Sequence, residues 1–260
     1  KKLVGGAGLT MAGIAAFGIS APFPADPANG IMTAPTNNRH WRNVPILQYL
    51  RDGLGLPGCF ENDANCGALA EWFFGAGRGC KDFIYLTMST GIGGGIIIDG
   101  KIYGGFNFAG AELGHTVIMV DGEPCTCGRL GCWEAYASAT ALIRQTRQAA
   151  LAHPESLLAQ VEEITGRTAF DAAGQGDAAA KAVVAQYAVY VAAGLTDFVN
   201  ILAPEMILLG GGISRQGEAL LAPIREYVAT HCFGQREGAI PTIAAAKLGN
   251  EAGIIGAAAL

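Results

Sequence analysis

Charged residues are scarce in this sequence, and no group of basic residues stands out. Asp, Glu, Lys and Arg make up 15% of the 260 residues, and the formal net charge is -5. Lys and Arg are scattered along the chain instead of forming the basic face that nucleic-acid binding requires. We therefore expect no nucleic-acid partner. Hydrophobic residues make up 51% and 38 residues are glycine, which is typical of a tightly packed globular protein with many turns.

The sequence also lacks an uninterrupted apolar run that could cross a membrane. A spanning helix needs about 20 predominantly apolar residues. The run from Met11 to Phe23 is too short, and the run from Ala178 to Ala203 contains Lys181 and Asp197. Both runs are therefore predicted to be buried elements, and no membrane association is expected. The first residues lack the charged, apolar and cleavage-site succession of a secretory signal.

Seven cysteines are present, an odd number that makes a poor disulfide framework. Three of them lie close together, between Cys125 and Cys132. The other four lie among apolar or small residues, and we expect them to be buried free thiols: Cys59, Cys66, Cys80 and Cys232. Free thiols fit a reducing compartment, so the cytoplasm is the expected location.

Segments with a strand pattern are mixed with long segments with a helix pattern, which predicts an α/β fold. The expected strands are 14–20, 59–61, 83–88, 95–98, 102–103, 206–209 and one near 243. The expected helices are 47–54, 62–75, 133–152, 177–202, 216–230 and one from 250. Residues 26–42 are rich in Pro and Asn and are expected to form loops.

Three cysteines and one histidine form the most specific local pattern. The chain reads Glu112-Leu-Gly-His115 and then Cys125-Thr-Cys127-Gly-Arg-Leu-Gly-Cys132-Trp-Glu134. Three thiols and one imidazole are the ligands that tetrahedral Zn²⁺ prefers, and the glycines let the chain turn around the ion. The alternative is a set of core cysteines beside an unrelated histidine. Four protein ligands would close the site, so the predicted role of the zinc is structural.

Three carboxylates near these motifs could bind a ligand. Glu112 and Glu134 flank the predicted zinc site, where a rigid platform could aim them at the hydroxyls of a sugar. Their alternative is a pair of solvated surface acids. Asp63 follows Asn62 at a predicted strand-to-helix junction, where it is either a helix N-cap or a ligand-binding carboxylate at the carboxyl end of a strand.

Two glycine-rich segments each follow a predicted strand. Thr90-Gly-Ile-Gly-Gly-Gly95 follows Met88, and Gly210-Gly-Gly212 follows Leu209. Consecutive glycines let backbone N–H groups approach phosphates closely. The first segment lacks the Gly-Lys-Ser/Thr of a Walker A loop, and a strand instead of a helix is expected to follow it, unlike a dinucleotide-binding turn. A glycine-rich hairpin and a tight turn are the respective alternatives.

Taken in this order, the motifs resemble those of the ROK family (repressor, open reading frame, kinase) of sugar kinases and sugar-responsive repressors. The resemblance runs from about Ile14 to the end of the chain. It is sharpest from Met88 to His115, where glycines at 91, 93, 95 and 105 precede Glu112-Leu-Gly-His115, and the cysteines follow at the family's spacing. The resemblance implies an α/β, ribonuclease-H-like fold of two lobes, as in actin and hexokinase, with a zinc knot.

In that fold, residues 1–60 would form part of the small lobe, joined by a C-terminal helix at 250–260. Residues 61–249 would form the large lobe, with the zinc site and the nucleotide loops. The resemblance also implies a phosphate loop of the Asp-x-Gly-Gly-Thr kind, which it places before Lys1. We therefore expect a chain that begins at Lys1 to bind phosphates poorly, and a longer chain to be active. Equal activity of both would show that the loop is misplaced.

The resemblance assigns roles to individual residues. Asp63 is the implied catalytic base. The implied sugar-binding residues are Asn37, Asn62, Asp63, Glu112, His115 and Glu134. The implied zinc ligands are His115, Cys125, Cys127 and Cys132. The implied ATP-binding residues are Thr90, Gly91, Gly93, Gly94 and Gly95 at the phosphates, and Gly210, Gly211 and Gly212 near the nucleoside.

These roles imply an ATP- and Mg²⁺-dependent kinase for a hexose, with glucose as the first choice. Fructose, mannose, allose and the N-acetylhexosamines are the alternative sugars. A sugar-sensing repressor domain that does not use ATP and an inactive zinc-stabilised binding module are the alternative functions. The resemblance also leads us to expect a homo-oligomer, either a dimer or a tetramer.

Overall fold

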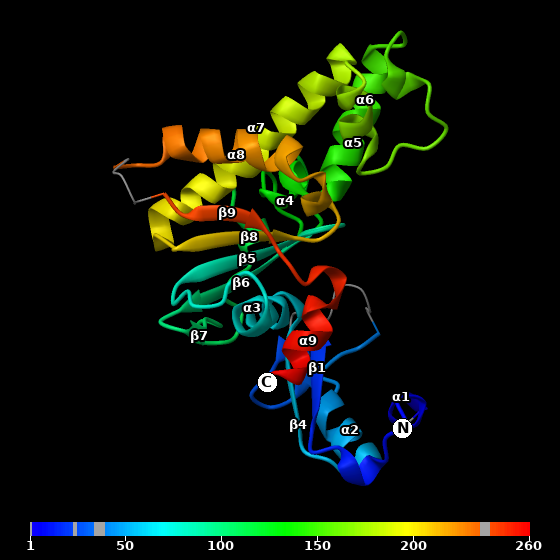
Figure 1. The fold of residues 1–260 in the computed structure, drawn as a ribbon, viewed down its shortest axis with the longest axis vertical. Helices are drawn as coiled ribbons and strands as arrows, with labels where there is room; N and C mark the ends of the chain where they lie inside the picture. The colour runs from blue at the N-terminus through cyan, green and yellow to red at the C-terminus, as the bar shows by residue number, and fades with distance from the viewer. Residues whose placement is uncertain (1, 23–24, 34–39, 235–239) are drawn as a thin grey trace.

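The computed structural model describes residues 2–22, 25–33, 40–234 and 240–260. Its centre is a five-stranded sheet in the order β7-β6-β5-β8-β9 (Figure 1). The strands are β5 (Phe83–Met88), β6 (Ile92–Ile98), β7 (Lys101–Ile102), β8 (Met206–Gly210) and β9 (Thr242–Ala245). β5, β8 and β9 run parallel, whereas β6 is antiparallel to both β5 and β7. The expected α/β class is therefore observed.

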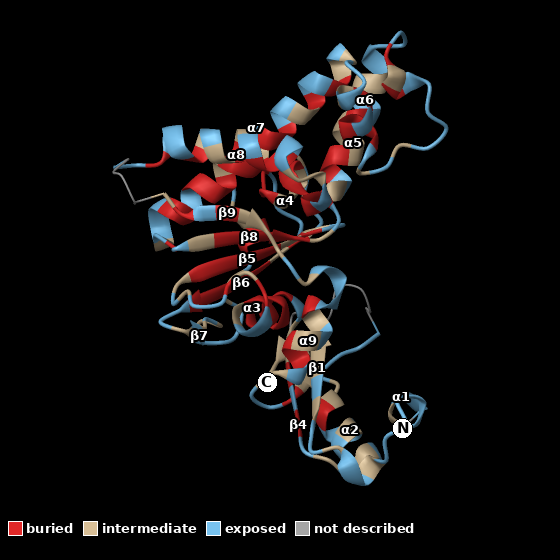
Figure 2. Cartoon of the chain, in the orientation of Figure 1, coloured by how far each residue is buried: buried red, intermediate tan, exposed pale blue. Residues whose placement is uncertain are grey.

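Helices cover both faces of this sheet, which explains why β5 reads as a continuous apolar run. Ile84, Leu86 and Met88 belong to the main core, which they share with α7 (Ala178–Leu202) and α8 (Glu218–His231). Phe83 and Tyr85 alternate with them and lie in a second core with side chains of α3 (Asp63–Phe74). Figure 2 shows the buried residues concentrated in β5, β8 and the helix faces that touch them. Successive side chains of β5 therefore point into two different cores, as expected for a strand that is buried on both faces.

The long apolar run after Asp177 is a helix of the core. α7 is the one helix in the described part of the chain that is long and apolar enough to cross a membrane. Its Tyr187, Val191 and Leu195 are fully buried among the other residues of the main core. The sequence predicted a buried element here, and the packing agrees with that prediction.

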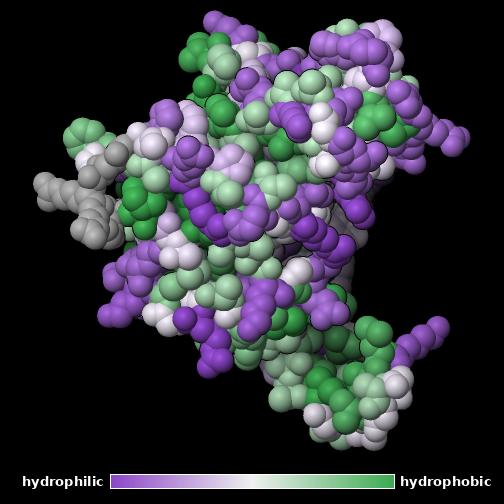
Figure 3. Space-filling view, turned by 45° about the horizontal axis from the view of Figure 1, so that its top comes forward, coloured by the Kyte–Doolittle hydropathy of each residue, from purple (hydrophilic) through white to green (hydrophobic). Residues whose placement is uncertain are grey.

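A second, smaller group of elements contains both ends of the chain (Figure 1), and it projects from the larger body of the molecule in the space-filling view (Figure 3). β1 (Phe17–Ala21) pairs in parallel with β4 (Gly58–Asn62), and α9 (Ala252–Ala258) packs against β1 and α3. The packing of α9 requires glycines. A Cβ on Gly18 would lie 1.6 Å from the carbonyl oxygen of Ala257, and one on Gly256 would lie 1.7 Å from that of Cys66. The C-terminal helix therefore packs beside the N-terminal elements.

Among the remaining elements, the structure differs from the sequence prediction at three places. The loop predicted at 26–42 contains part of a small antiparallel pair, β2 (Ala25–Asp26) with β3 (Ile31–Met32). The helix predicted at 133–152 is broken into α4 (Glu134–Ala137) and α5 (Ala139–Ala152). Ser138 has an extended backbone at the break and its side chain caps α5 by accepting the Ala141 N–H. α6 (Thr168–Gly174) was not predicted. α2 (Ile46–Leu54) was predicted. α1 (Lys2–Gly6) is short and has no buried residue.

All seven cysteines are free thiols. Of the four expected to be buried, Cys66 and Cys232 are buried and Cys80 is half-buried, but Cys59 is exposed. The prediction for Cys59 was wrong because the residue lies in β4, where side chains alternate between the two faces. Its neighbours Gly58 and Phe60 are buried, so Cys59 points outward.

Candidate active site

Asn62 and Asp63 lie where β4 ends and α3 begins, and they have different structural roles. The Asn62 side chain is the N-cap of α3, because its Oδ1 accepts hydrogen bonds from the backbone N–H groups of Ala64, at 2.8 Å, and Asn65, at 3.1 Å. Asp63 is the first residue of the helix and its Oδ1 also accepts from the Ala64 N–H, at 2.8 Å. Since Asn62 is the cap, the reading of Asp63 as the N-cap is not supported.

The Asp63 carboxyl group faces a cavity of about 240 Å³ at the carboxyl ends of the central strands. The cavity is lined by Asp63, Tyr85, Thr87, Ser89, Gly211, Gly249, Asn250 and Gly253. Part of Asp63 is exposed to this space, but the surrounding protein displaces enough water to raise the pKa of its carboxyl group above the ordinary value. The hydrogen bond from the Ala64 N–H acts in the opposite direction and is the smaller effect.

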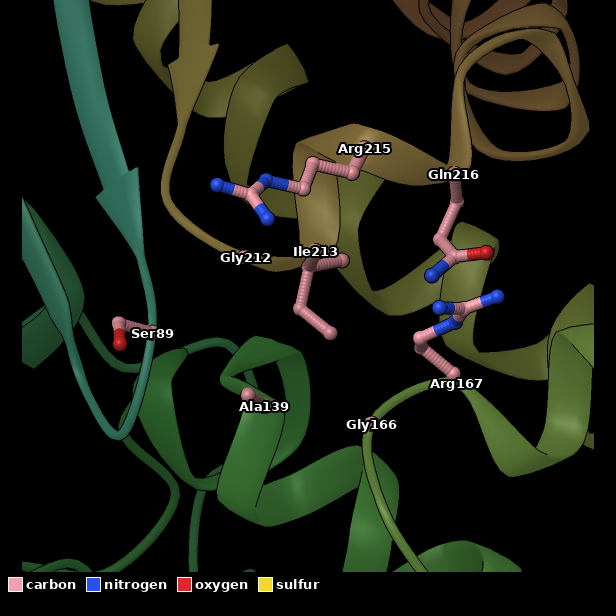
Figure 4. A pocket seen from close by; sticks show the side chains of 8 residues that line it. All are labelled: Ser89, Ala139, Gly166, Arg167, Gly212, Ile213, Arg215 and Gln216. Carbon is pink, nitrogen blue, oxygen red and sulfur yellow. The ribbon is translucent and has the colours of Figure 1, made fainter. Parts of the chain in front are cut away.

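A second cavity, of about 480 Å³, adjoins the first. Figure 4 shows the residues that line it: Ser89, Ala139, Gly166, Arg167, Gly212, Ile213, Arg215 and Gln216. Ser89 lines both cavities, and Gly211 of the first is followed directly by Gly212 of the second. The two cavities therefore adjoin at Ser89 and are together called the cleft, with Asp63 in the first cavity and the two arginines in the second.

The predicted metal ligands lie together. The ligand atoms of His115, Cys125, Cys127 and Cys132 all lie within 4.8 Å of one another. Cys127 Sγ is 3.6 Å from Cys132 Sγ, and Cys125 Sγ is 3.5 Å from His115 Nδ1. A tetrahedral zinc ion with Zn–S bonds of about 2.3 Å holds its sulfur ligands roughly 3.8 Å apart. The donor types and their separations both fit such an ion, so the cluster could hold zinc.

Glycines shape the loop that carries the three cysteines. Gly128 and Gly131 have positive φ values of 89° and 77°, which non-glycine residues rarely adopt. A Cβ on Gly131 would also lie 1.6 Å from the carbonyl oxygen of Met119. These turns bring Cys132, which is buried, back toward Cys127. The glycines therefore bend the chain at the predicted positions.

The predicted sugar-binding acids lie beside this cluster. Glu134 is half-buried, and its carboxylate accepts hydrogen bonds from the Ile92 N–H, at 2.8 Å, and from the Thr126 hydroxyl, at 3.3 Å. It is therefore not a freely solvated acid, because it connects the start of β6 with the cysteine loop. Burial raises the pKa of Glu112, His115 lowers it, and the charges of Asp63 and Glu134 raise it. Asp63, His115 and Glu134 thus lie close enough for their charges to act on Glu112.

Most of the predicted glycine loop is a strand. β6 begins at Ile92, so Gly93, Gly94 and Gly95 pair with β5, and only Ser89, Thr90 and Gly91 form the turn. Steric contacts explain why two of these strand positions require glycine. A Cβ on Gly94 would lie 2.6 Å from the Ala111 carbonyl oxygen, and one on Gly95 would lie 2.6 Å from the Ala64 carbonyl oxygen. These glycines allow α3 and the segment before Glu112 to approach the sheet.

Of the three glycines predicted to lie near the nucleoside, one belongs to a strand and two line the cleft. Gly210 is buried as the last residue of β8, whereas Gly211 and Gly212 line the cleft. Asn37 lies outside the described residues. Sequence reasoning missed Tyr85 and Thr87, which lie within the predicted strand 83–88, and Ser89, which directly follows it at the end where α/β proteins bind ligands. It also missed Arg167, Arg215 and Gln216, for which no local pattern exists.

Comparison with known proteins decides the family. A sequence model of the ROK family matches residues 2–260. The chain belongs to the ROK family. Its similarity to structures of this family confirms the predicted ribonuclease-H-like class of the actin and hexokinase superfamily.

Individual ROK relatives include both kinases and repressors. A glucokinase of Thermotoga maritima is 39% identical over 94% of this chain and 78% of the relative. The structure of a ROK family glucokinase from Streptomyces griseus, in complex with glucose and AMPPNP, has a TM-score of 0.84 at 37% identity, covering 99% of this chain and 85% of that one. A xylose repressor of Caldicellulosiruptor bescii is 35% identical over 90% of this chain and 59% of the relative.

Proposed function

We propose that this protein transfers the γ-phosphoryl group of ATP to a hydroxyl of a hexose, with glucose as the preferred sugar. One observation carries the proposal. Asp63 lies at one end of a cleft that is large enough for a nucleotide, and its charge acts on Glu112 beside the Cys/His cluster. The relatives known as glucokinases support glucose as the first sugar to test.

Asp63 is the proposed general base. Phosphoryl transfer passes through a loose transition state, so positioning and charge stabilisation provide most of the catalysis. Asp63 orients the attacking hydroxyl and accepts its proton as the new P–O bond forms. Desolvation raises the pKa of Asp63 and makes its carboxylate a stronger base than an ordinary aspartate. The helix start fixes the position of this group, because Asn62 caps α3 at the preceding residue.

The proposed sugar contacts come from Asn62, Glu112, His115 and Glu134, with Asn37 as a further candidate. Nδ1 of His115 faces the Cys125 sulfur, which leaves Nε2 to donate a hydrogen bond to a sugar oxygen. Glu112 and Glu134 accept hydrogen bonds from hydroxyls. We propose that His115, Cys125, Cys127 and Cys132 hold a structural zinc ion. When bound, this ion stabilises the loop between Glu112 and Glu134 and fixes the imidazole tautomer.

The proposed donor site is the cleft beyond Asp63. The turn from Ser89 to Gly91 and the segment from Gly211 to Gly212 present backbone groups to the phosphates. Gly93, Gly94 and Gly95 support this turn from within β6. Mg²⁺ enters with ATP, where it offsets the charge on the phosphate oxygens.

Three further expectations, on the lobes, the location and the assembly of the protein, accompany the proposal. We propose that residues 61–249 form the large lobe and that 1–60 with 250–260 belong to the small lobe, which the packing of α9 on β1 supports. Free thiols at the four cysteines outside the cluster favour the cytoplasm. A homo-oligomer, a dimer or a tetramer, is the expected assembly.

Sugar sensing without phosphorylation is the second candidate function, because the chain also resembles a xylose repressor. The experiment that separates the two is an ATP-coupled assay with a panel of glucose, fructose, mannose, allose, N-acetylhexosamines and xylose. It is run on the 260-residue chain and on a form extended upstream. We expect ATP-dependent turnover with glucose from the extended form, and with fewer of the other sugars. Sugar binding by the extended form without turnover on any member of the panel would favour the sensing function.

A further inference from the structure

The cavity beyond Ser89 carries two positive charges and no negative one. Of the residues that line it, Arg167 and Arg215 are charged and none is acidic. The whole chain has a formal charge of -5, so this concentration of positive charge is local. Among the residues that the structure describes, Arg215 has no ion pair. Arg167 has one weak partner, Asp171, at 3.7 Å, and both side chains are largely exposed to water.

The charged side chains lie at opposite ends of the cavity. Figure 4 shows the Arg215 guanidinium extending past Gly212 toward the end of β5 and the turn that carries Ser89, whereas Arg167 and Gln216 face each other at the other end. The Ser89 end adjoins the cavity that contains Asp63. Ala139 and Ile213 provide an apolar surface between the two ends. The cavity is thus divided into a cationic end near the catalytic base and a distal end with a guanidinium opposite an amide.

We infer that Arg215 binds the phosphates of the donor and that Arg167 and Gln216 enclose its base. This inference rests on the proposed function, and it identifies residues that set donor affinity. The phosphates must point toward Asp63, so the Arg215 end receives them. A guanidinium binds two phosphate oxygens at once. A guanidinium also stacks on an aromatic base, and a glutamine amide can pair with an adenine edge. The distal end therefore provides the groups that a purine needs.

Two partial ligands separate these roles. Tripolyphosphate with Mg²⁺ carries the phosphates alone, and adenosine carries the nucleoside alone. In calorimetric titrations, Arg215→Gln should weaken tripolyphosphate binding about tenfold or more, because a charge-assisted bidentate contact is lost. It should leave adenosine binding within about twofold, a ratio near the smallest that such a titration resolves. Arg215→Lys should restore part of the loss, since it keeps the charge but not the planar fork. Arg167→Gln and Gln216→Ala should have the reverse pattern, weakening adenosine and sparing tripolyphosphate.

The matched control is Arg147→Gln. Arg147 is an exposed arginine of α5 that lines neither cavity, and its replacement removes the same charge from the protein. It should change neither affinity. If Arg215→Gln weakens both partial ligands equally, or leaves tripolyphosphate binding unchanged, the division of roles is wrong. If the form extended upstream, with none of these substitutions, binds neither partial ligand nor ATP, the proposed kinase function itself fails, which is a distinct result.

Discussion

Asp63→Asn should lower turnover by about 10²–10⁴-fold, the usual contribution of a general base, while glucose affinity changes little. Asn keeps the size of the side chain and can still hold a hydroxyl, but it cannot accept the proton. The carboxylate is required in its ionised form, so the turnover of the unmodified protein should fall as the pH decreases through the pKa of Asp63. Because burial raises that pKa, the loss should begin above the pH at which an ordinary aspartate titrates. Coupled assays across pH and glucose titrations test both statements.

The same substitution should stabilise the folded protein at neutral pH. A pKa that is higher in the folded than in the unfolded state means that folding disfavours the charged form. The associated stability is fully present below the unfolded pKa and is lost as the pH rises through the folded pKa. Asn has no charge to desolvate, so Asp63→Asn should raise the melting temperature at pH 7, and its advantage should disappear in acid.

Asp197→Asn is the matched control for this effect. Burial also raises the pKa of Asp197, which lies in α7 and lines neither cavity of the cleft. Its replacement should stabilise the protein in the same direction and leave turnover unchanged. If Asp63→Asn retained normal turnover, Asp63 would not be the base, whatever its effect on stability.

Removing the proposed zinc ion should weaken sugar binding as well as the fold. Cys127→Ser, or treatment with a chelator, takes a ligand or the ion from a loop that is otherwise mostly exposed. Changes around a metal site commonly cost about 10–100-fold in affinity or activity, and we expect a loss of that order for glucose. The melting temperature should fall by several degrees, on the order of 5 °C for 1–2 kcal/mol. Metal analysis, glucose titration and thermal unfolding measure the three consequences.

Cys59→Ser is the control for loss of a thiol, because Cys59 is exposed and lies outside the cluster. It should change neither the metal content nor the glucose affinity. If the metal-free protein bound glucose normally, the cluster would not support the sugar-binding residues, even if the untreated protein contained zinc. Binding of tripolyphosphate should be affected less, because the donor cavity is built from other segments.

The sequence predicted those features of the fold and the site that depend on neighbouring residues. Asn62 and Asp63 open a helix because an Asn cap and the following helical segment are local signals. The Cys/His cluster could be predicted because its four ligands lie within a short stretch, with glycines at the turns. The strands from Phe83 and Met206 were predictable because strands buried on both faces are continuously apolar.

What the sequence did not predict depends on contacts between distant segments. The break at Ser138 coincides with a hydrogen bond from the Ala139 N–H to the Ser89 carbonyl, 50 residues away, at 2.9 Å. The glycines of β6 read as a phosphate loop because their real constraint, the approach of Ala111 and of α3, is visible only in three dimensions. Arg167 precedes α6 and Arg215 lies in the turn after β8, yet both line the same cavity. Neither belongs to a motif.

A crystal structure of the Asp63→Asn protein with glucose and ATP tests the central claim most directly, because the substitution should trap both substrates. The account predicts one glucose hydroxyl within hydrogen-bond distance of residue 63, in line with the γ-phosphate. It also predicts other glucose hydroxyls on Glu112, His115 and Glu134, and donor phosphates beside Arg215. Glucose bound away from residue 63, or phosphates outside the cleft that contains Ser89 and Gly212, would contradict it.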